Sequence, residues 1–266
     1  MLKRALVAVA HGSADPRAAE AIGALMALVA LRAADRGLSV PDLRAAYLGH
    51  AAPSVSQVMR TFGPDTQVTV LPLLLTAAYH SKTDIPRVLA RAGTARLNVT
   101  YGAPLGPHPL VLRALERRLP ETAFENPAKT GVVLAAAGSS DPGANATIAG
   151  LAAQWQAAAG WFAVRPAYAS AIRPAAAGGQ GSPAAAGAQG STAPAQAVTE
   201  LLRAGARRVV VASYLLAPGL FADRIRDASL AAGAAEVSPA LGAVPEVADI
   251  VLDRYQEAAM RVQTAA

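Results

Sequence analysis

Histidine is the residue type in this sequence that is best suited to hold a transition metal. The chain has 266 residues and no cysteine, which excludes thiolate catalysis, disulfides and metal sites with thiolate ligands. Any metal must therefore be held by imidazole, carboxylate, carbonyl or water. Imidazole is mostly neutral near physiological pH, binds Fe²⁺, Co²⁺ and Ni²⁺ more readily than a carboxylate does, and can accept a proton. The four histidines are His11, His50, His80 and His108.

Two of these histidines follow apolar runs that are typical of buried parallel strands. His11 comes directly after residues 5–10, and His80 comes after the run at residues 66–75. Ligands of parallel α/β sheets bind beyond the carboxyl ends of the strands, where the strand order reverses. If the order is 2-1-3-4, the two strands are neighbours and both imidazoles converge on one crevice. A single histidine at a strand end is as readily structural, but the pair favours a catalytic and metal-binding function.

Alternating strands and helices must position these side chains. Asp15 and Pro16 are typical of a helix start, and Gly37 of a helix end. The sequence predicts strands at residues 5–10, 43–48, 66–75 and 97–101, and helices at residues 16–35, from Pro53, at 85–91 and at 109–119. Such alternation predicts a parallel sheet with right-handed crossovers, and hence a four-stranded α/β unit.

The second half of the chain repeats the first. Four pairs of segments match in the same order, namely residues 7–16 with 133–142, 44–47 with 165–168, 68–80 with 209–221, and 103–109 with 239–245. We therefore predict two tandem, similar units, each a four-stranded parallel sheet flanked by helices. The boundaries would be 1–125 and 126–266, because the stretch 121–129 is polar and proline-bearing, like a linker.

The second copy is an internal control for the two histidines. Ala137 stands at the position that matches His11, and Phe221 stands at the position that matches His80. The surrounding strand and turn residues persist although both imidazoles are missing. We infer that the first unit keeps the chemistry, while the degenerate second unit supplies packing and a cleft wall.

One segment interrupts the repeat. Residues 175–195 consist almost wholly of Ala, Gly, Gln, Ser, Thr and Pro, at the place where the first copy passes directly into a helix. This composition cannot bury enough apolar area to offset the entropy of ordering, so we expect a flexible loop. A tolerated surface insertion explains it better than a functional lid does.

The net charge of +6 is compatible with several partners. The arginines are scattered, with no basic run or basic helix, which favours a small polyanion over nucleic acid. A basic surface without function explains the charge equally well. The apolar stretch before His11 is too short for a signal peptide, and the longest apolar run, residues 21–31, is too short to span a bilayer. We expect a cytoplasmic protein with no nucleic-acid or membrane partner.

Residues 9–16 and the segment from Pro72 to Pro86, with Tyr79-His80 inside it, resemble the sirohydrochlorin chelatases. These belong to the class II chelatases, which insert cobalt or iron during cobalamin and siroheme synthesis. Residues 215–221 resemble the degenerate half of two-repeat members, so the resemblance spans the chain apart from the insertion. It implies insertion of Fe²⁺, favoured here, or Co²⁺ into sirohydrochlorin, with no cofactor beyond this metal substrate. A monomer is expected, since the fused units would replace a homodimer.

By this resemblance His11 and His80 carry the metal-binding and catalytic roles. The family often has an acidic residue at the place of Gly49, and this chain departs from that pattern. Either His50 takes over part of that role, or a carboxylate comes from elsewhere, or the site works without one.

Cationic side chains should orient a substrate that bears many carboxylates. The candidates are Arg17, Lys82 and Arg87, which follow the two histidine motifs, although solvated helix positions would explain them equally well. His108, between two prolines at a helix start, is expected to be structural or exposed to solvent.

Three other classes of protein compete with this interpretation. Histidine phosphatases typically show Arg-His-Gly, whereas Ala10 precedes the histidine here. A dinucleotide-binding enzyme is disfavoured because no G-x-G-x-x-G follows the first strand. A non-enzymatic carrier of metal or tetrapyrrole remains open, because the sequence barely separates it from a chelatase.

Overall fold

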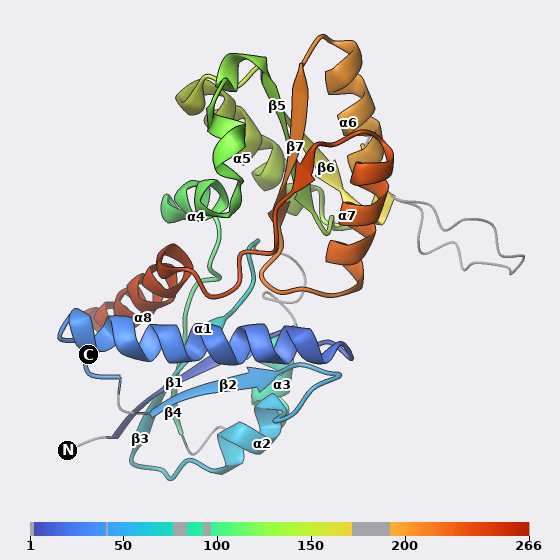
Figure 1. Ribbon diagram of the computed structural model, residues 1–266. Coiled ribbons are helices and arrows are strands. Elements are labelled where there is room, and N and C mark those ends of the chain that lie inside the picture. The colour runs from blue at the N-terminus through green and yellow to red at the C-terminus, as the bar shows by residue number, and fades with distance from the viewer. Residues whose placement is uncertain (1–2, 41, 77–83, 93–96, 172–191, 266) are drawn as a thin grey trace, which may run out of the picture. The chain divides into compact units, whose positions relative to one another are not determined.

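The protein consists of two compact units, as a computed structural model shows (Figure 1). The structure describes residues 3–40, 42–76, 84–92, 97–171 and 192–265. The first unit is formed by Met1–Ala114 together with Gly242–Ala266, and the second by Leu115–Leu241.

The first unit contains a parallel sheet of four strands in the order β2-β1-β3-β4. Its strands are β1 (Lys3–Ala10), β2 (Asp42–Tyr47), β3 (Thr66–Pro72) and β4 (Asn98–Tyr101). β1 is central, since Val7 pairs with Arg44 on one side and with Val70 on the other. From Ala5 to Ala10 every β1 residue is buried, as expected for a strand covered on both faces. The predicted strand order is confirmed.

Helices cover this sheet, and their ends follow the local sequence. They are α1 (Pro16–Asp35), α2 (Val55–Arg60), α3 (Ile85–Arg91) and the first part of α4 (Leu110–Arg118). α1 begins and ends as predicted, with Asp15 as N-cap and Gly37 at a φ of +63°. α2 begins two residues after Pro53, because Ser54 forms a capping box with Gln57.

The second unit repeats this architecture with the strand order β6-β5-β7-β8. Its strands are β5 (Thr130–Ala136), β6 (Ala163–Tyr168), β7 (Arg208–Tyr214) and β8 (Glu236–Val237). Its helices are α5 (Pro142–Ala159), α6 (Pro194–Arg203) and α7 (Leu220–Ala231), with short 3₁₀ turns η3 (Glu121–Phe124), η4 (Pro127–Lys129) and η5 (Ala169–Ala171). The predicted fold of two tandem, four-stranded parallel units is confirmed.

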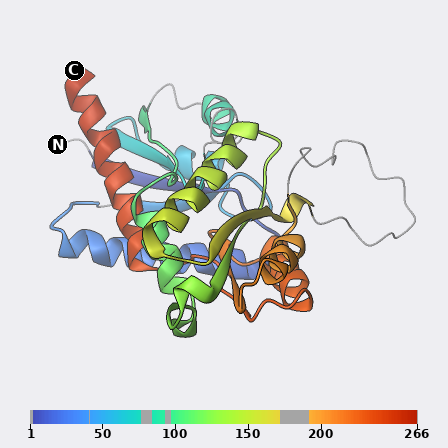
Figure 2. The same cartoon turned by 90° about the horizontal axis from the view of Figure 1, so that it is seen from above.

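The last helix, α8 (Pro245–Ala265), packs on the first unit, where it lies against α1, β3 and β4 (Figures 1 and 2). Arg32 on α1 forms a bidentate salt bridge with Asp249 on α8, with N–O distances of 2.9 and 2.7 Å. Arg36 bonds Asp249 at 3.0 Å and Asp253 at 2.7 Å. No helix in the described part of the chain is long and apolar enough to cross a lipid bilayer.

The boundaries of the two compact units therefore differ from the expected boundaries 1–125 and 126–266. Residues 242–266 follow the second repeat in sequence, but their apolar face completes the core of the first unit. Conversely, α4 ends in the second unit, where Glu116 accepts a hydrogen bond from Trp155 Nε1 at 3.0 Å. There Arg118 also donates to the carbonyl oxygen of Leu241. The repeat marks sequence similarity, whereas burial decides which helix closes which unit.

The insertion lies between β6 and α6. Residues 172–191, most of the expected loop 175–195, lie outside the described residues. The expected loop extends too far at its end, because Pro194 already begins α6. Tyr168 N–H donates to the carbonyl oxygen of Thr192 at 2.9 Å, just as Tyr47 N–H donates to that of Pro53 at 3.0 Å. Immediately after the insertion, the second unit thus forms the same backbone contact as the corresponding segment of the first unit.

Candidate active site

The turn after β1 places His11 at the carboxyl end of the first sheet. Gly12 turns the chain with a φ of +89°, a conformation that favours glycine. A Cβ atom on Gly12 would lie 1.7 Å from the carbonyl oxygen of Gly49. Only a residue without a side chain therefore allows the turn to approach the segment after β2, and His11 leaves the strand in a fixed direction.

Polar side chains fix the start of α1, directly beyond this turn. Ser13 Oγ accepts a hydrogen bond from the N–H of Asp15 at 3.1 Å, and Asp15 Oδ1 accepts one from the N–H of Arg17 at 3.0 Å. The Arg17 side chain also donates to both carboxylate oxygens. These bonds hold the pKa of Asp15 below its ordinary value, so the charged carboxylate stays at the positive end of the helix dipole.

The second unit builds the same turn without a histidine. Gly138 has a φ of +83°, Ser139 Oγ accepts from the N–H of Asp141 at 3.0 Å, and Asp141 Oδ1 accepts from the N–H of Gly143 at 2.9 Å. Ala137 occupies the position that matches His11. The turn therefore does not require an imidazole. The role of this serine, Ser13 in the first unit and Ser139 in the second, was not predicted from the sequence, although its presence in both copies of the repeat could have indicated it.

The ring of His11 is exposed, and a backbone carbonyl orients it. His11 Nδ1 lies 3.1 Å from the carbonyl oxygen of Gly12. A carbonyl can only accept, so this bond requires a proton on Nδ1 and leaves the lone pair of the neutral ring on Nε2. Metal-binding histidines commonly donate their second nitrogen to a carbonyl or carboxylate in this way. His11 is thus arranged to present Nε2 as a ligand or as a proton acceptor.

The segment after β2 lies against the backbone of His11. Gly49 N–H donates to the carbonyl oxygen of His11 at 3.1 Å. A Cβ atom built on Gly49 would meet nothing within 4 Å, so an acidic side chain would have room at this position. The next residue, His50, is exposed and has a φ of +60°. The structure brings the loop of His50 next to that of His11, while a role of His50 in binding stays a prediction.

His80 and Lys82 lie in residues 77–83, outside the described part of the chain. Their predicted roles are therefore not tested. Pairing continues just beyond β3, where Leu73 N–H donates to the carbonyl oxygen of Val9 at 2.7 Å. The chain thus leaves β3 at the carboxyl end of the sheet, where the turn after β1 also lies. Among the described residues, no group of three or more histidine, aspartate or glutamate side chains could hold a metal ion.

The two predicted cationic contacts outside that segment lie at helix starts. Arg17 is bonded to the capping carboxylate of Asp15, and 49% of its side chain is exposed. Arg87 is exposed on the first turn of α3. Contacts of either side chain with substrate stay predictions.

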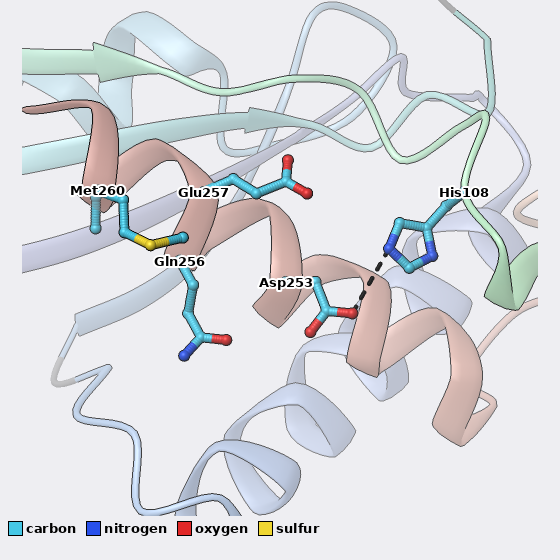
Figure 3. Close-up of a pocket in the computed structure, with 6 residues that line it drawn as sticks. His108, Asp253, Gln256, Glu257 and Met260 are labelled. Carbon is cyan, nitrogen blue, oxygen red and sulfur yellow. Dashed lines mark ion pairs between the residues drawn. The ribbon is translucent and has the colours of Figure 1, made fainter.

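A cavity of about 460 Å³ lies elsewhere in the first unit, against α8 (Figure 3). Its lining consists of His108, Asp253, Gln256, Glu257, Ala259 and Met260. His108 Nδ1 accepts a hydrogen bond from the N–H of Leu110 at 3.2 Å, and its Nε2 lies 3.6 Å from Asp253 Oδ2. His108 therefore connects the start of α4 to α8, which is a structural role.

Comparison with known proteins identifies the family. The CbiX family model matches residues 5–122 and 184–258. The sirohydrochlorin cobaltochelatase of Priestia megaterium is 27% identical over 236 residues, which cover 84% of this chain and 68% of that protein. The sirohydrochlorin ferrochelatase of Bacillus subtilis (strain 168) is 29% identical over 157 residues, which cover 57% of each chain.

Solved structures share the fold. SirB from Bacillus subtilis with Fe³⁺ matches with a TM-score of 0.74 at 24% identity, over 98% of both chains. SirB from Bacillus subtilis subspecies spizizenii in complex with cobalt matches with a TM-score of 0.71 at 23% identity, over 98% of this chain and 97% of that one. The fold is thus that of the chelatases. The chain belongs to the CbiX family, and the predicted membership among the sirohydrochlorin chelatases is confirmed.

The glycine turn can be tested by two substitutions. We expect Gly12→Ala to lower the free energy of unfolding by roughly 3 kcal/mol or more, because it combines a left-handed φ with a backbone clash. Gly49→Ala is the matched control and should change it by less than about 0.5 kcal/mol, since open space surrounds this position. Urea unfolding measures both values, and equal effects would contradict the assigned geometry.

His108 should make stability depend on pH. Burial, and then Arg254, lower its pKa from the ordinary value, whereas Asp253 and Glu257 act in the opposite direction. The neutral ring therefore stabilises the fold above the unfolded-state pKa, and this contribution is lost as the pH falls through the lower folded-state pKa.

The matching variant is His108→Asn, whose side-chain oxygen can accept the N–H of Leu110 but does not titrate. As the pH is lowered from about 7 to about 5, wild type should lose unfolding free energy relative to this variant. Two parallel curves of unfolding free energy against pH would refute the assignment.

Proposed function

We propose that this protein inserts a divalent metal ion into sirohydrochlorin, with His11 and His80 as the working pair. The observation that carries the proposal is the arrangement of His11. Its ring is exposed at the carboxyl end of β1, and a backbone carbonyl orients it with the lone pair on Nε2. We infer the substrate from the names of the related chelatases of Priestia megaterium and Bacillus subtilis.

An open pair of imidazoles suits the transfer of a metal. A hydrated ion must shed water and still have coordination positions available for the nitrogens of the macrocycle. Two neutral histidines hold such an ion without the charge of a carboxylate, so the ion keeps its full attraction for the incoming nitrogens. The fixed turn at Gly12 keeps His11 in place while the ion moves away from it.

The reaction must also release protons. Each macrocycle loses two pyrrole N–H protons as its nitrogens bind the divalent ion, so the charge stays balanced. A histidine that has just given up its metal is neutral and can accept one of these protons. His11 lies where solvent can then remove that proton, because its side chain is exposed.

The substrate bears several carboxylates, and the net charge of +6 favours binding of such a polyanion. We infer that Arg17, Lys82 and Arg87 orient these groups and that His50 lies at the edge of the site. Arg17 would have to exchange part of its bond with Asp15 for a substrate carboxylate. The choice between Fe²⁺ and Co²⁺ follows from supply rather than from two imidazoles, which accept both ions. We propose Fe²⁺ as the physiological metal.

The decisive experiment follows the absorption spectrum of sirohydrochlorin with Co²⁺ or, without oxygen, Fe²⁺. Wild type should accelerate insertion over the metal alone, and His11→Ala and His80→Ala should each lose at least about 100-fold of this acceleration. His108→Asn, which removes a structural histidine, is the matched control and should keep it. Binding of metal and tetrapyrrole without acceleration would indicate a carrier, and wild-type rates in both alanine variants would refute the roles of the pair.

A further inference from the structure

In the second unit, a side chain holds the backbone of the turn after β5. Asn145, on the first turn of α5, bonds both backbone groups of Ser139. Its Oδ1 accepts the N–H of Ser139 at 3.0 Å, and its Nδ2 donates to the carbonyl oxygen of Ser139 at 2.8 Å. A carboxamide oxygen thus occupies the position in front of this N–H.

The first unit builds the same turn without this clamp. Counted from the N-cap aspartates of α1 and α5, Ala19 is the counterpart of Asn145, and Ser13 is the counterpart of Ser139. The methyl group of Ala19 can neither accept nor donate a hydrogen bond. Within the residues that the structure describes, the backbone N–H and carbonyl groups of Ser13 form no hydrogen bond. Ser13 therefore presents a backbone donor two residues after His11.

A tyrosine hydroxyl beside this turn also has no partner. Tyr47 is only 6% exposed, and its Cβ lies 3.4 Å from the place of a Cβ on Gly12. In the second unit the corresponding Tyr168 donates from its hydroxyl to the carbonyl oxygen of Asn145 at 2.9 Å. The hydroxyl of Tyr47 bonds no group in the described part of the chain. Buried polar groups are normally paired, so two donors without a partner around one turn indicate a place that a ligand completes.

The backbone, rather than charged side chains, determines what this place can bind. Asp15 and Arg17 bond each other, so their charges cancel. The N–H of Ser13 lies just before the positive end of α1, a helix of 20 residues, and N–H groups at such ends bind oxygen atoms of anions. The second unit shows that a planar carboxamide oxygen fits the turn, and a carboxylate oxygen has the same geometry.

We propose that the N–H of Ser13 binds a peripheral carboxylate of the tetrapyrrole, an inference that rests on the proposed function. One carboxylate oxygen takes the position that Asn145 Oδ1 takes in the second unit. A carboxylate cannot donate, so the carbonyl oxygen of Ser13 stays hydrated. The bond is charge-assisted, lies within the first unit and orients the macrocycle relative to the imidazole of His11. The second unit pairs its own N–H and cannot bind substrate in this way.

The substitution Ala19→Asn transfers the clamp of the second unit to the first. Its carboxamide should bond the N–H of Ser13 and exclude the carboxylate. Titration of the metal-free variant with sirohydrochlorin should then give a dissociation constant that is raised by roughly tenfold or more, as expected for the loss of a charge-assisted hydrogen bond. The affinity for Co²⁺ alone should stay within about twofold of wild type, because His11 is unchanged.

Ala24→Asn is the matched control. It places the same side chain at an exposed position of α1, outside the turn, with the same loss of helix propensity. Its affinity for sirohydrochlorin should equal that of wild type.

Hydrogen exchange of the Ser13 amide, followed by NMR, observes the contact directly. In wild type this N–H should exchange more slowly once sirohydrochlorin is bound, and in Ala19→Asn it should exchange slowly without the ligand. An exchange rate in wild type that saturation with sirohydrochlorin leaves unchanged overturns the proposal, whether or not the variant forms the clamp.

The binding data can overturn the proposal independently. It fails if Ala19→Asn protects the N–H of Ser13 and still binds sirohydrochlorin like wild type, or if Ala24→Asn loses as much affinity. A variant that loses Co²⁺ affinity in parallel would show a disturbed His11 instead of a blocked contact, which also contradicts the proposal. These outcomes leave metal insertion by wild type intact. If wild type neither binds sirohydrochlorin nor inserts metal, the proposed function itself fails, and this contact fails with it.

Discussion

The close approach of two backbone segments at the end of β1 is the constraint on which the candidate site depends. The turn after β1 passes so near the carbonyl oxygen of Gly49 that a side chain on Gly12 has no space. The hydrogen bond from Gly49 N–H to the carbonyl oxygen of His11 closes the same contact from the other side. Because the backbone of His11 lies between these fixed points, it keeps one conformation without support from a bound metal, and the carbonyl oxygen of Gly12 orients the ring.

The duplicated architecture shows which residues the turn after the first strand of each unit requires and which it does not. Both units have the glycine at positive φ, the serine that ties the turn and the capping aspartate. Only the first unit has the imidazole. The unit that carries it is also discontinuous in sequence, since α8 must return from the end of the chain to cover α1, β3 and β4. The residues after 241 are therefore part of the fold that positions His11.

The regular parts of the fold could be predicted from sequence because local rules determine them. Buried strands show continuous apolar runs, Asp15 and Pro16 start a helix, and the repeat predicts two sheets of equal topology. The packing of α8 could not be predicted, because an apolar helix face carries no information about which sheet it covers. The start of α2 was placed too early because Pro53 is an evident turn residue, whereas the capping box of Ser54 and Gln57 sets the boundary.

The candidate site was predictable only in part. Its predicted location follows from where the histidines stand relative to the strands, and the structure places His11 directly after β1, whereas His80 lies outside the described residues. Side-chain partners depend on the three-dimensional structure, so the bond between Arg17 and Asp15 could not be predicted from the sequence. The same holds for the contacts of His108 with Leu110 and Asp253. The exposure of Leu220 and Phe221 was equally hidden, because apolar residues after a strand usually enter the core.

X-ray absorption spectroscopy of the Co²⁺-loaded protein shows whether the imidazoles of His11 and His80 bind the same ion, as we propose. We expect two imidazole nitrogens among the cobalt ligands of wild type, and one in His11→Ala and in His80→Ala alike. A cobalt spectrum that stays the same after either substitution would refute the proposed pair.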